Sequence, residues 1–281
     1  MKKQYETDLL WNNYLHTMNN NFHKKDYTEY VQNLRLITNN SIDTAKQMYS
    51  QLVIDILNPL VKHFIKWVLD NARYNIVINQ RDAWPFLAYS KGAFKEIYMT
   101  RGIYLNTDDN LLLEYLDQNL LGQPISLIDT GCMGNASNKI RQLGYTVQSL
   151  FLYTKNPSIQ SFFTSESVKK IIKKTIPTCS PDKFSHIIMR TFDLSIPKYY
   201  QSPCELKRNK ENIITPVLKK SDLLSQILSK SMESHFGTQC NKTLEETIHR
   251  LAKDFELSRH GEKSILMQFH RHNNTNKLLW Y

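Results

Sequence analysis

The segment SLIDTGCMGNASNKIRQLG, residues 126–144, combines an acidic residue with a short loop that contains two glycines. An apolar run ends at Asp129, and a helical pattern follows the loop. Glycines let backbone N–H groups approach an anion, and the start of a helix adds partial positive charge. The segment therefore predicts a phosphate-binding loop, and the alternative is a tight turn that only joins a strand to a helix. The candidate binding residues are Thr130, Gly131, Cys132, Met133, Gly134, Asn135 and Ser137.

Two earlier segments carry arginines that could meet the same ligand. In VINQRDAWPF, Arg81 and Asp82 follow an apolar run and precede a short helix. A guanidinium binds phosphate or carboxylate through two hydrogen bonds, whereas Asp82 could hold a metal, orient Arg81 or cap the helix. In YMTRGIYL, Arg101 interrupts an apolar, strand-like run, where a charge is costly unless it is paired or lies at an edge. We expect Arg101 either at a sheet edge or in the same cleft.

The elements that position these loops alternate between strands and helices. Because strand, helix and strand follow one another several times, the pattern predicts a parallel sheet with right-handed crossovers. Ligands of such sheets bind beyond the carboxyl ends of the strands, where all three segments fall. The expected elements are a strand at 74–79, a helix at 83–94, a strand at 96–105, a helix at 108–122, a strand at 124–129, a helix at 135–144 and a strand at 146–154.

Helical segments flank this predicted core. Residues 4–38 and 44–71 have partial helical periodicity, and Pro59 is expected to kink or divide the second segment. After the core, residues 165–176 predict an amphipathic helix, residues 184–195 a strand or a helix, and residues 221–235 and 243–257 two further helices. We therefore expect three regions: an N-terminal helical segment at 1–71, an α/β phosphate-binding core at 72–155, and a basic, mostly helical region at 156–281.

The net charge of +10 is concentrated in the second half of the chain. Residues 155–281 hold 21 Lys+Arg and 12 Asp+Glu, whereas residues 1–154 hold 15 and 14. A basic half could bind nucleic acid or an acidic protein, and the alternative is a solvated lysine-rich surface. Part of this positive charge lies on one face of the helix expected at 165–176, which is formed by Lys169, Lys170, Lys173 and Lys174.

The sequence also argues against several classes of protein. The four cysteines are widely spaced and form no CxxC pair, so neither a disulfide framework nor a zinc site is expected. The N-terminus lacks the apolar run of a signal peptide, and the most apolar stretch contains several charged residues. We expect a cytoplasmic protein without a membrane span.

Taken in order, VINQRDAWPFLAY, IYMTRGIYL and ISLIDTGCMGNASNKIRQLGYTVQSLFLY resemble the core of type I phosphoribosyltransferases. The resemblance implies an α/β fold with a parallel sheet, in which Arg81 and Asp82 lie on the pyrophosphate side and Asp129 meets the ribose hydroxyls. It implies a loop at 130–137 for the 5-phosphate. It further implies Mg²⁺, held by Asp82 and Asp129, that neutralises the leaving pyrophosphate. Asp129, Arg81 and Asp82 would be the catalytic residues.

A closer resemblance is to the domain found behind haloacid dehalogenase-type hydrolase domains in bacterial surface-polysaccharide loci. Its pattern is an ARDG motif after an apolar strand, then SR, then DxGxxG. The corresponding segments here are Gln80–Ala83, Thr100–Arg101 and Asp129–Gly134, within a resemblance that covers about residues 50–155. Ala83 stands where the pattern has glycine.

From these observations, the leading hypothesis is that the protein is an enzyme that acts on a phosphorylated sugar or nucleotide in the manner of a phosphoribosyltransferase. The alternatives are a non-catalytic protein that binds nucleic acid or a partner through its basic C-terminal half, and a nucleotide sensor.

Overall fold

The computed structural model describes residues 42–80, 82–90, 92–177, 180–190, 192, 199–221 and 223–259 of the 281-residue chain. The helix expected at 4–38 lies outside these residues. The chain divides into two compact units. Unit 1 comprises residues 1–59, 194–199 and 221–281, and unit 2 comprises residues 60–193 and 200–220.

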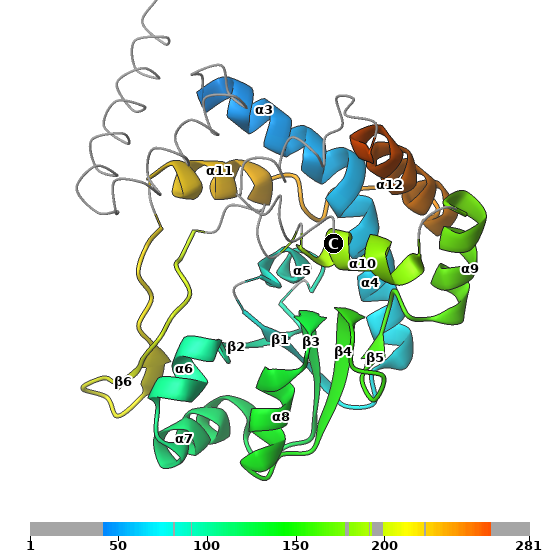
Figure 1. Ribbon diagram of the computed structural model, residues 1–281. Helices are drawn as coiled ribbons and strands as arrows, with labels where there is room; N and C mark the ends of the chain where they lie inside the picture. The colour runs from blue at the N-terminus through cyan, green and yellow to red at the C-terminus, as the bar shows by residue number, and fades with distance from the viewer. Residues whose placement is uncertain are drawn as a thin grey trace, which may run out of the picture. The chain divides into compact units, whose positions relative to one another are not determined.

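Unit 2 contains a five-stranded sheet in which all neighbouring strands are parallel (Figure 1). The strands lie in the order β2-β1-β3-β4-β5. The chain runs from β1 outward to β2 and then returns past β1 to β3, so the direction of winding reverses between β1 and β3. The predicted α/β fold with a parallel sheet is confirmed. The strand bounds are β1 Asn75–Asn79, β2 Lys95–Ile97, β3 Ile125–Cys132, β4 Val147–Thr154 and β5 Gln160–Ser161.

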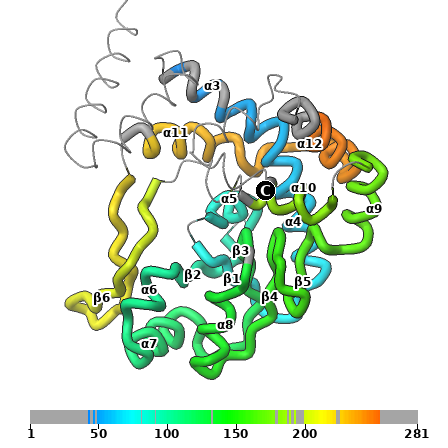
Figure 2. Tube along the Cα trace, in the orientation of Figure 1, coloured from blue at the N-terminus to red at the C-terminus, as the bar shows by residue number. Residues whose placement is uncertain are grey.

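Helices connect β1 to β2, β2 to β3 and β3 to β4, as the alternating pattern predicts, whereas β4 and β5 are joined by a short loop (Figure 2). Asp108 caps α7, because its carboxylate accepts hydrogen bonds from the backbone N–H groups of Asn110 and Leu111. The amphipathic helix expected at 165–176 is α9, which buries Val168 and Ile172. The helices of unit 2 are α4 Asn58–Asn71 (from Leu60 onward), α5 Trp84–Leu87, α6 Arg101–Asn106, α7 Asp109–Leu120, α8 Asn135–Gln142, α9 Glu166–Thr175 and α10 Pro181–Arg190.

The strand predicted at 96–105 is wrong beyond Ile97. β2 pairs with β1, and the pairing ends where Ile97 meets Asn79, the last residue of β1. Beyond that point the apolar run has no partner strand, so it forms α6 instead. Thr100 begins this helix by accepting a hydrogen bond from the Ile103 N–H. Arg101 is therefore the first residue of α6, and it is exposed rather than inside a strand.

Two further expectations are corrected or settled in unit 2. The strand expected to end at Asp129 continues to Cys132, because Gly131 and Cys132 still pair with Tyr153 and Thr154 of β4. The predicted glycine loop is thus reduced to Met133 and Gly134, between β3 and α8. The ambiguous segment at 184–195 is helical from 184 to 190, where it forms the second part of α10.

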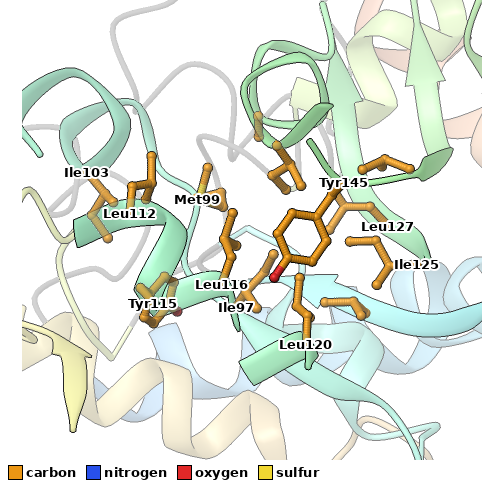
Figure 3. Packing of buried hydrophobic residues seen from close by; sticks show 14 of the residues in the cluster. Ile97, Met99, Ile103, Leu112, Tyr115, Leu116, Leu120, Ile125, Leu127 and Tyr145 are labelled. Atoms are coloured by element: carbon orange, nitrogen blue, oxygen red, sulfur yellow. The ribbon is translucent and has the colours of Figure 1, made fainter. Parts of the chain in front are cut away.

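One face of the sheet packs against α6, α7 and α8 (Figure 3). Ile125 and Leu127 of β3 lie beside Tyr145, and Ile97 of β2 lies near Leu116 of α7. The Tyr115 hydroxyl accepts a hydrogen bond from the Tyr98 N–H, and burial raises the pKa of Tyr115 to about 12. Because the side chains of a strand alternate, the neighbouring residues of these strands face the other way.

A second buried group in unit 2 is aromatic. Phe64 of α4 contacts Phe86 of α5, with ring centroids 4.8 Å apart, and Phe162 with centroids 6.0 Å apart. Phe163 meets Phe184 of α10 edge to face. Since α5 contacts β1, and α10 contacts β3 and β4, this group fixes both helices to the sheet.

An antiparallel hairpin completes unit 2. β6 Leu206–Arg208 pairs with β7 Ile214–Pro216, and the Gln118 side chain of α7 hydrogen-bonds both the N–H and the carbonyl of Ile214. The chain before the hairpin passes closely over α6. There, Thr100 Oγ1 donates to the Pro203 carbonyl, and a Cβ at Gly102 would lie 2.7 Å from Cys204 Sγ.

The described part of unit 1 is helical. It consists of α3 Ile42–Leu52, a π-helical turn at Val53–Leu57, the first residues of α4, α11 Leu223–Glu233 and α12 Leu244–Arg259. The last two match the helices expected at 221–235 and 243–257. No helix in the ranges given above is long and apolar enough to cross a membrane.

The irregularity expected at Pro59 is this π-helical turn, which lies just before the proline. Proline has no N–H, and its ring crowds the carbonyl four residues earlier, which belongs to Asp55. The widened turn accommodates that crowding. The Asp55 carbonyl oxygen accepts a hydrogen bond from Lys242 Nζ at 3.4 Å. The Asn58 N–H bonds to the carbonyl five residues earlier, that of Val53, as in a π-helix.

Candidate functional site

Unit 2 has a cavity of about 590 Å³ at the carboxyl ends of β1 and β3. We call it the switch-point cavity, because it lies where the winding of the sheet reverses, the usual place for ligands in open parallel sheets. Its walls come from the ends of β1 and β3, the middle of β4, the starts of α6 and α8, α10, and the segment before the hairpin. Polar residues of the lining include Asn79, Asp82, Arg101, Asp129, Thr130 and Asn135.

The register of the sheet places Asn79 beside Asp129. Val77 pairs with Leu127 and Ile78 with Ile128, so the next residues along both strands meet. Asn79 Nδ2 donates a hydrogen bond to Asp129 Oδ2 at 2.7 Å. The contact continues the β1–β3 pairing through side chains, at the point where β1 ends.

Hydrogen bonds offset only part of the cost of burying the charged Asp129 carboxylate. Burial raises its pKa to about 6, and the nearby carboxylate of Asp82 acts in the same direction. Hydrogen bonds from Asn79 and from the backbone of Thr130 and Gly131 oppose the rise. Because burial outweighs these hydrogen bonds, a cation or a hydrogen-bond donor of a ligand would be favourable beside this carboxylate.

The two glycines of this segment, Gly131 near the end of β3 and Gly134 before α8, are required by the backbone itself. Gly131 has φ +118°, and a Cβ there would lie 1.8 Å from the carbonyl oxygen of Tyr153. Gly134 has φ +79° and is the residue before α8, where a Cβ would come within 2.3 Å of Ile159 Cδ1. A tight strand-to-helix connection therefore explains both glycines. The same connection brings the first residues of α8 to the cavity, so the two interpretations of this segment are compatible.

The structure brings most of the predicted site residues to one cavity. Eight of them line it: Asp82, Arg101, Asp129, Thr130, Gly131, Met133, Gly134 and Asn135. Ser137 is fully buried in α8 and is not among the lining residues. Arg81 and the side chain of Cys132 lie outside the described part of the chain. The four lysines of α9 do not line the cavity either.

Sequence reasoning missed several lining residues. Asn79 is a polar residue at the end of an apolar strand, a signal that could have marked it. Tyr104 and Phe151 come from elements whose apolar pattern indicates only burial. Met189 and Ser202 reach the cavity from segments distant in sequence, which no local pattern connects to it.

The cavity offers two carboxylates to a metal ion. Among the described residues, no group of three or more His, Cys, Asp and Glu side chains could hold a metal. Mg²⁺, however, is often held by one or two carboxylates, with water and substrate phosphates as its other ligands. Asp82 and Asp129 fit this kind of site, because a cation would offset the cost of burying the Asp129 charge and its repulsion by Asp82, the two causes that raise the Asp129 pKa.

No protein-family model matches this chain, and no curated protein is significantly similar to it in sequence. The geometry of the switch-point cavity is therefore what points to a function.

Proposed function

We propose that unit 2 binds a phosphorylated sugar or nucleotide in the switch-point cavity and acts on it in the manner of a phosphoribosyltransferase. The observation that carries the proposal is the placement of the Asp129 carboxylate and the start of α8 on one cavity at the carboxyl edge of the sheet. A carboxylate suits sugar hydroxyls or a cation, and the start of a helix suits a phosphate.

The dimensions of the cavity agree with such a ligand. Small-molecule sites usually measure about 300–1,000 Å³, and this one measures about 590 Å³. It combines polar residues with apolar walls that include Met99 and Phe151. This mixture is typical of sites for small organic molecules, because a few polar groups orient the ligand and the apolar walls exclude water.

Each part of the site has a proposed task. Asp129 accepts hydrogen bonds from the sugar hydroxyls, and the backbone from Thr130 to Ala136 binds the phosphate. Asp82 and Asp129 hold Mg²⁺, which would neutralise negative charge on a pyrophosphate leaving group. Arg101 supplies a positive charge at the cavity, and the resemblance implies the same task for Arg81.

Catalysis of this kind depends on positioning rather than on a covalent step. The site would hold donor and acceptor in line and stabilise an oxocarbenium-like transition state electrostatically. The resemblance of the QRDA, TR and DTGCMG segments to phosphoribosyltransferase-like domains supports this reaction class.

A thermal-shift screen tests the proposal. The wild-type chain is heated with phosphoribosyl pyrophosphate, nucleotides and sugar phosphates, each with and without Mg²⁺. A ligand that binds the folded state raises Tm, and the rise grows with the ratio of ligand concentration to Kd. We expect at least one phosphorylated compound to raise Tm, and to do so more strongly with Mg²⁺.

Two outcomes would contradict the proposal. One is that no phosphorylated compound changes Tm. The other is that nucleic acid binds instead, with an affinity that falls steeply as salt is added, which would favour a basic nucleic-acid-binding protein.

A further inference from the structure

The side chain of Asn79 makes two contacts with two different parts of the switch-point cavity. Its Nδ2 donates to Asp129 Oδ2 at 2.7 Å, and its Oδ1 accepts from the Met99 N–H at 2.9 Å. Only 7% of the residue is exposed. Because the two contacts use opposite atoms of one amide, together they fix how the amide is oriented.

These contacts join two walls of the cavity beyond the last paired residues of β1 and β2. Pairing between β1 and β2 ends at Ile97, so the buried Met99 N–H lies beyond the sheet. Met99 is followed directly by Thr100, which caps α6, and by Arg101. Asn79 therefore links the start of α6 to the carboxylate on β3.

We propose that Asn79 is a positioning residue of this site, which holds the Asp129 carboxylate and the segment that carries Arg101 in a fixed relation, so that one phosphorylated ligand can contact both side chains. The inference rests on the proposed function, and it adds a residue that the sequence motifs do not include. Hydrogen-bonded neighbours of metal-binding and ligand-binding carboxylates commonly have this task.

Other contacts of α6 serve a different connection. Thr100 and Gly102 hold the helix against the segment before the hairpin, at Pro203 and Cys204. Those contacts do not involve Asp129, whereas the Asn79 amide bonds both the Asp129 carboxylate and the segment that leads into α6.

Gln148 provides a matched control at the opposite edge of the same sheet. Its Oε1 accepts hydrogen bonds from the Arg73 N–H and from Ser126 Oγ, both at 2.8 Å, and its Nε2 donates to the Asn71 carbonyl at 2.9 Å. Like Asn79, it is an amide that joins separate chain segments. Unlike Asn79, it does not line the cavity.

The test compares the wild type with Asn79→Ala and Gln148→Ala by isothermal titration calorimetry. The probes are Mn²⁺ alone and phosphoribosyl pyrophosphate with Mg²⁺. Both variants should lower Tm, because each leaves buried polar groups unpaired. Asn79→Ala should weaken the binding of both probes by about 10- to 100-fold, whereas Gln148→Ala should leave affinity within about twofold. Equal affinities for Asn79→Ala and the wild type, or equal losses in both variants, would overturn the proposal.

A second measurement needs no variant, so it holds even if Asn79→Ala fails to fold. In the wild type, NMR should find slow exchange of the Asn79 side-chain amide protons and of the Met99 amide, and bound probe should slow both further. Rapid exchange of the Asn79 protons refutes the positioning role. A wild type that binds neither probe refutes the proposed function, and the exchange rates then decide separately whether the Asn79 contacts exist.

Discussion

Replacing Asp129 with asparagine should stabilise the protein at neutral pH, although the residue is the proposed centre of the site. The pKa of Asp129 rises from 3.8 to about 6 on folding, chiefly because the carboxyl is buried. The folded chain thus holds a proton that the unfolded chain releases. Stability falls as the pH rises from about 4 to about 6, and it stays lower above that range.

The expected gain follows from this difference in pKa. A rise from 3.8 to about 6 corresponds to about 3 kcal/mol of destabilisation at neutral pH. Asp129 is partly accessible from the cavity, and solvent screening reduces the expected value to about 2 kcal/mol. Asp129→Asn removes the charge, keeps the size of the side chain and can still accept the Asn79 hydrogen bond.

Urea unfolding of the full chain at pH 4.5 and pH 7.5 measures this effect. Asp129→Asn should gain about 2 kcal/mol at pH 7.5 and clearly less at pH 4.5. Asp70→Asn, an exposed carboxylate near the end of α4, is the control and should change stability by less than about 0.5 kcal/mol at either pH. Loss of stability in Asp129→Asn at pH 7.5, or an equal gain at both pH values, would refute the reasoning.

Four further substitutions test local parts of the account by urea unfolding. Gly131→Ala should cost more than about 3 kcal/mol, because positive φ strains the backbone and the new Cβ meets the Tyr153 carbonyl. Gly144→Ala, with φ +96° and open space, should cost only about 1 kcal/mol, and equal losses in both would contradict this explanation. Asp108→Ala should cost about 1 kcal/mol through the lost cap of α7, and no loss would mean that water replaces the cap. Thr243→Ala should cost a similar amount at the start of α12, where Thr243 and Glu246 cap each other, and this loss should shrink at low pH as Glu246 is protonated.

The parallel sheet could be predicted from the sequence because its strands and helices alternate with short connections. The apolar runs of β1, β3 and β4 are each bounded by polar or glycine residues, and α7 carries both a cap and an αL end at Leu121. Such local signals are enough to predict whether a segment forms a strand or a helix and in which order the elements follow. They also marked Asp82 and Asp129 as candidate site residues, and the structure has both in the lining of the switch-point cavity.

The errors arose where tertiary context decides the local structure. The run around Arg101 favours a strand by composition, but β1 ends at Asn79 and leaves it no partner. β3 continues past Asp129 because β4 is long enough to pair with Gly131 and Cys132. The contribution of Asn79 depends on the register of two strands, and that register is not visible in either strand alone.

The central claim is that Asp129 binds a phosphorylated ligand in the switch-point cavity. Its most direct test is a calorimetric titration of phosphoribosyl pyrophosphate, or of the strongest compound from the thermal-shift screen, into the wild type and Asp129→Asn at pH 7.5. We predict binding to the wild type that requires Mg²⁺ for full affinity, and at least a tenfold loss in Asp129→Asn despite its greater stability. Equal binding to both proteins, or no binding of any phosphorylated compound to the wild type, would contradict the account.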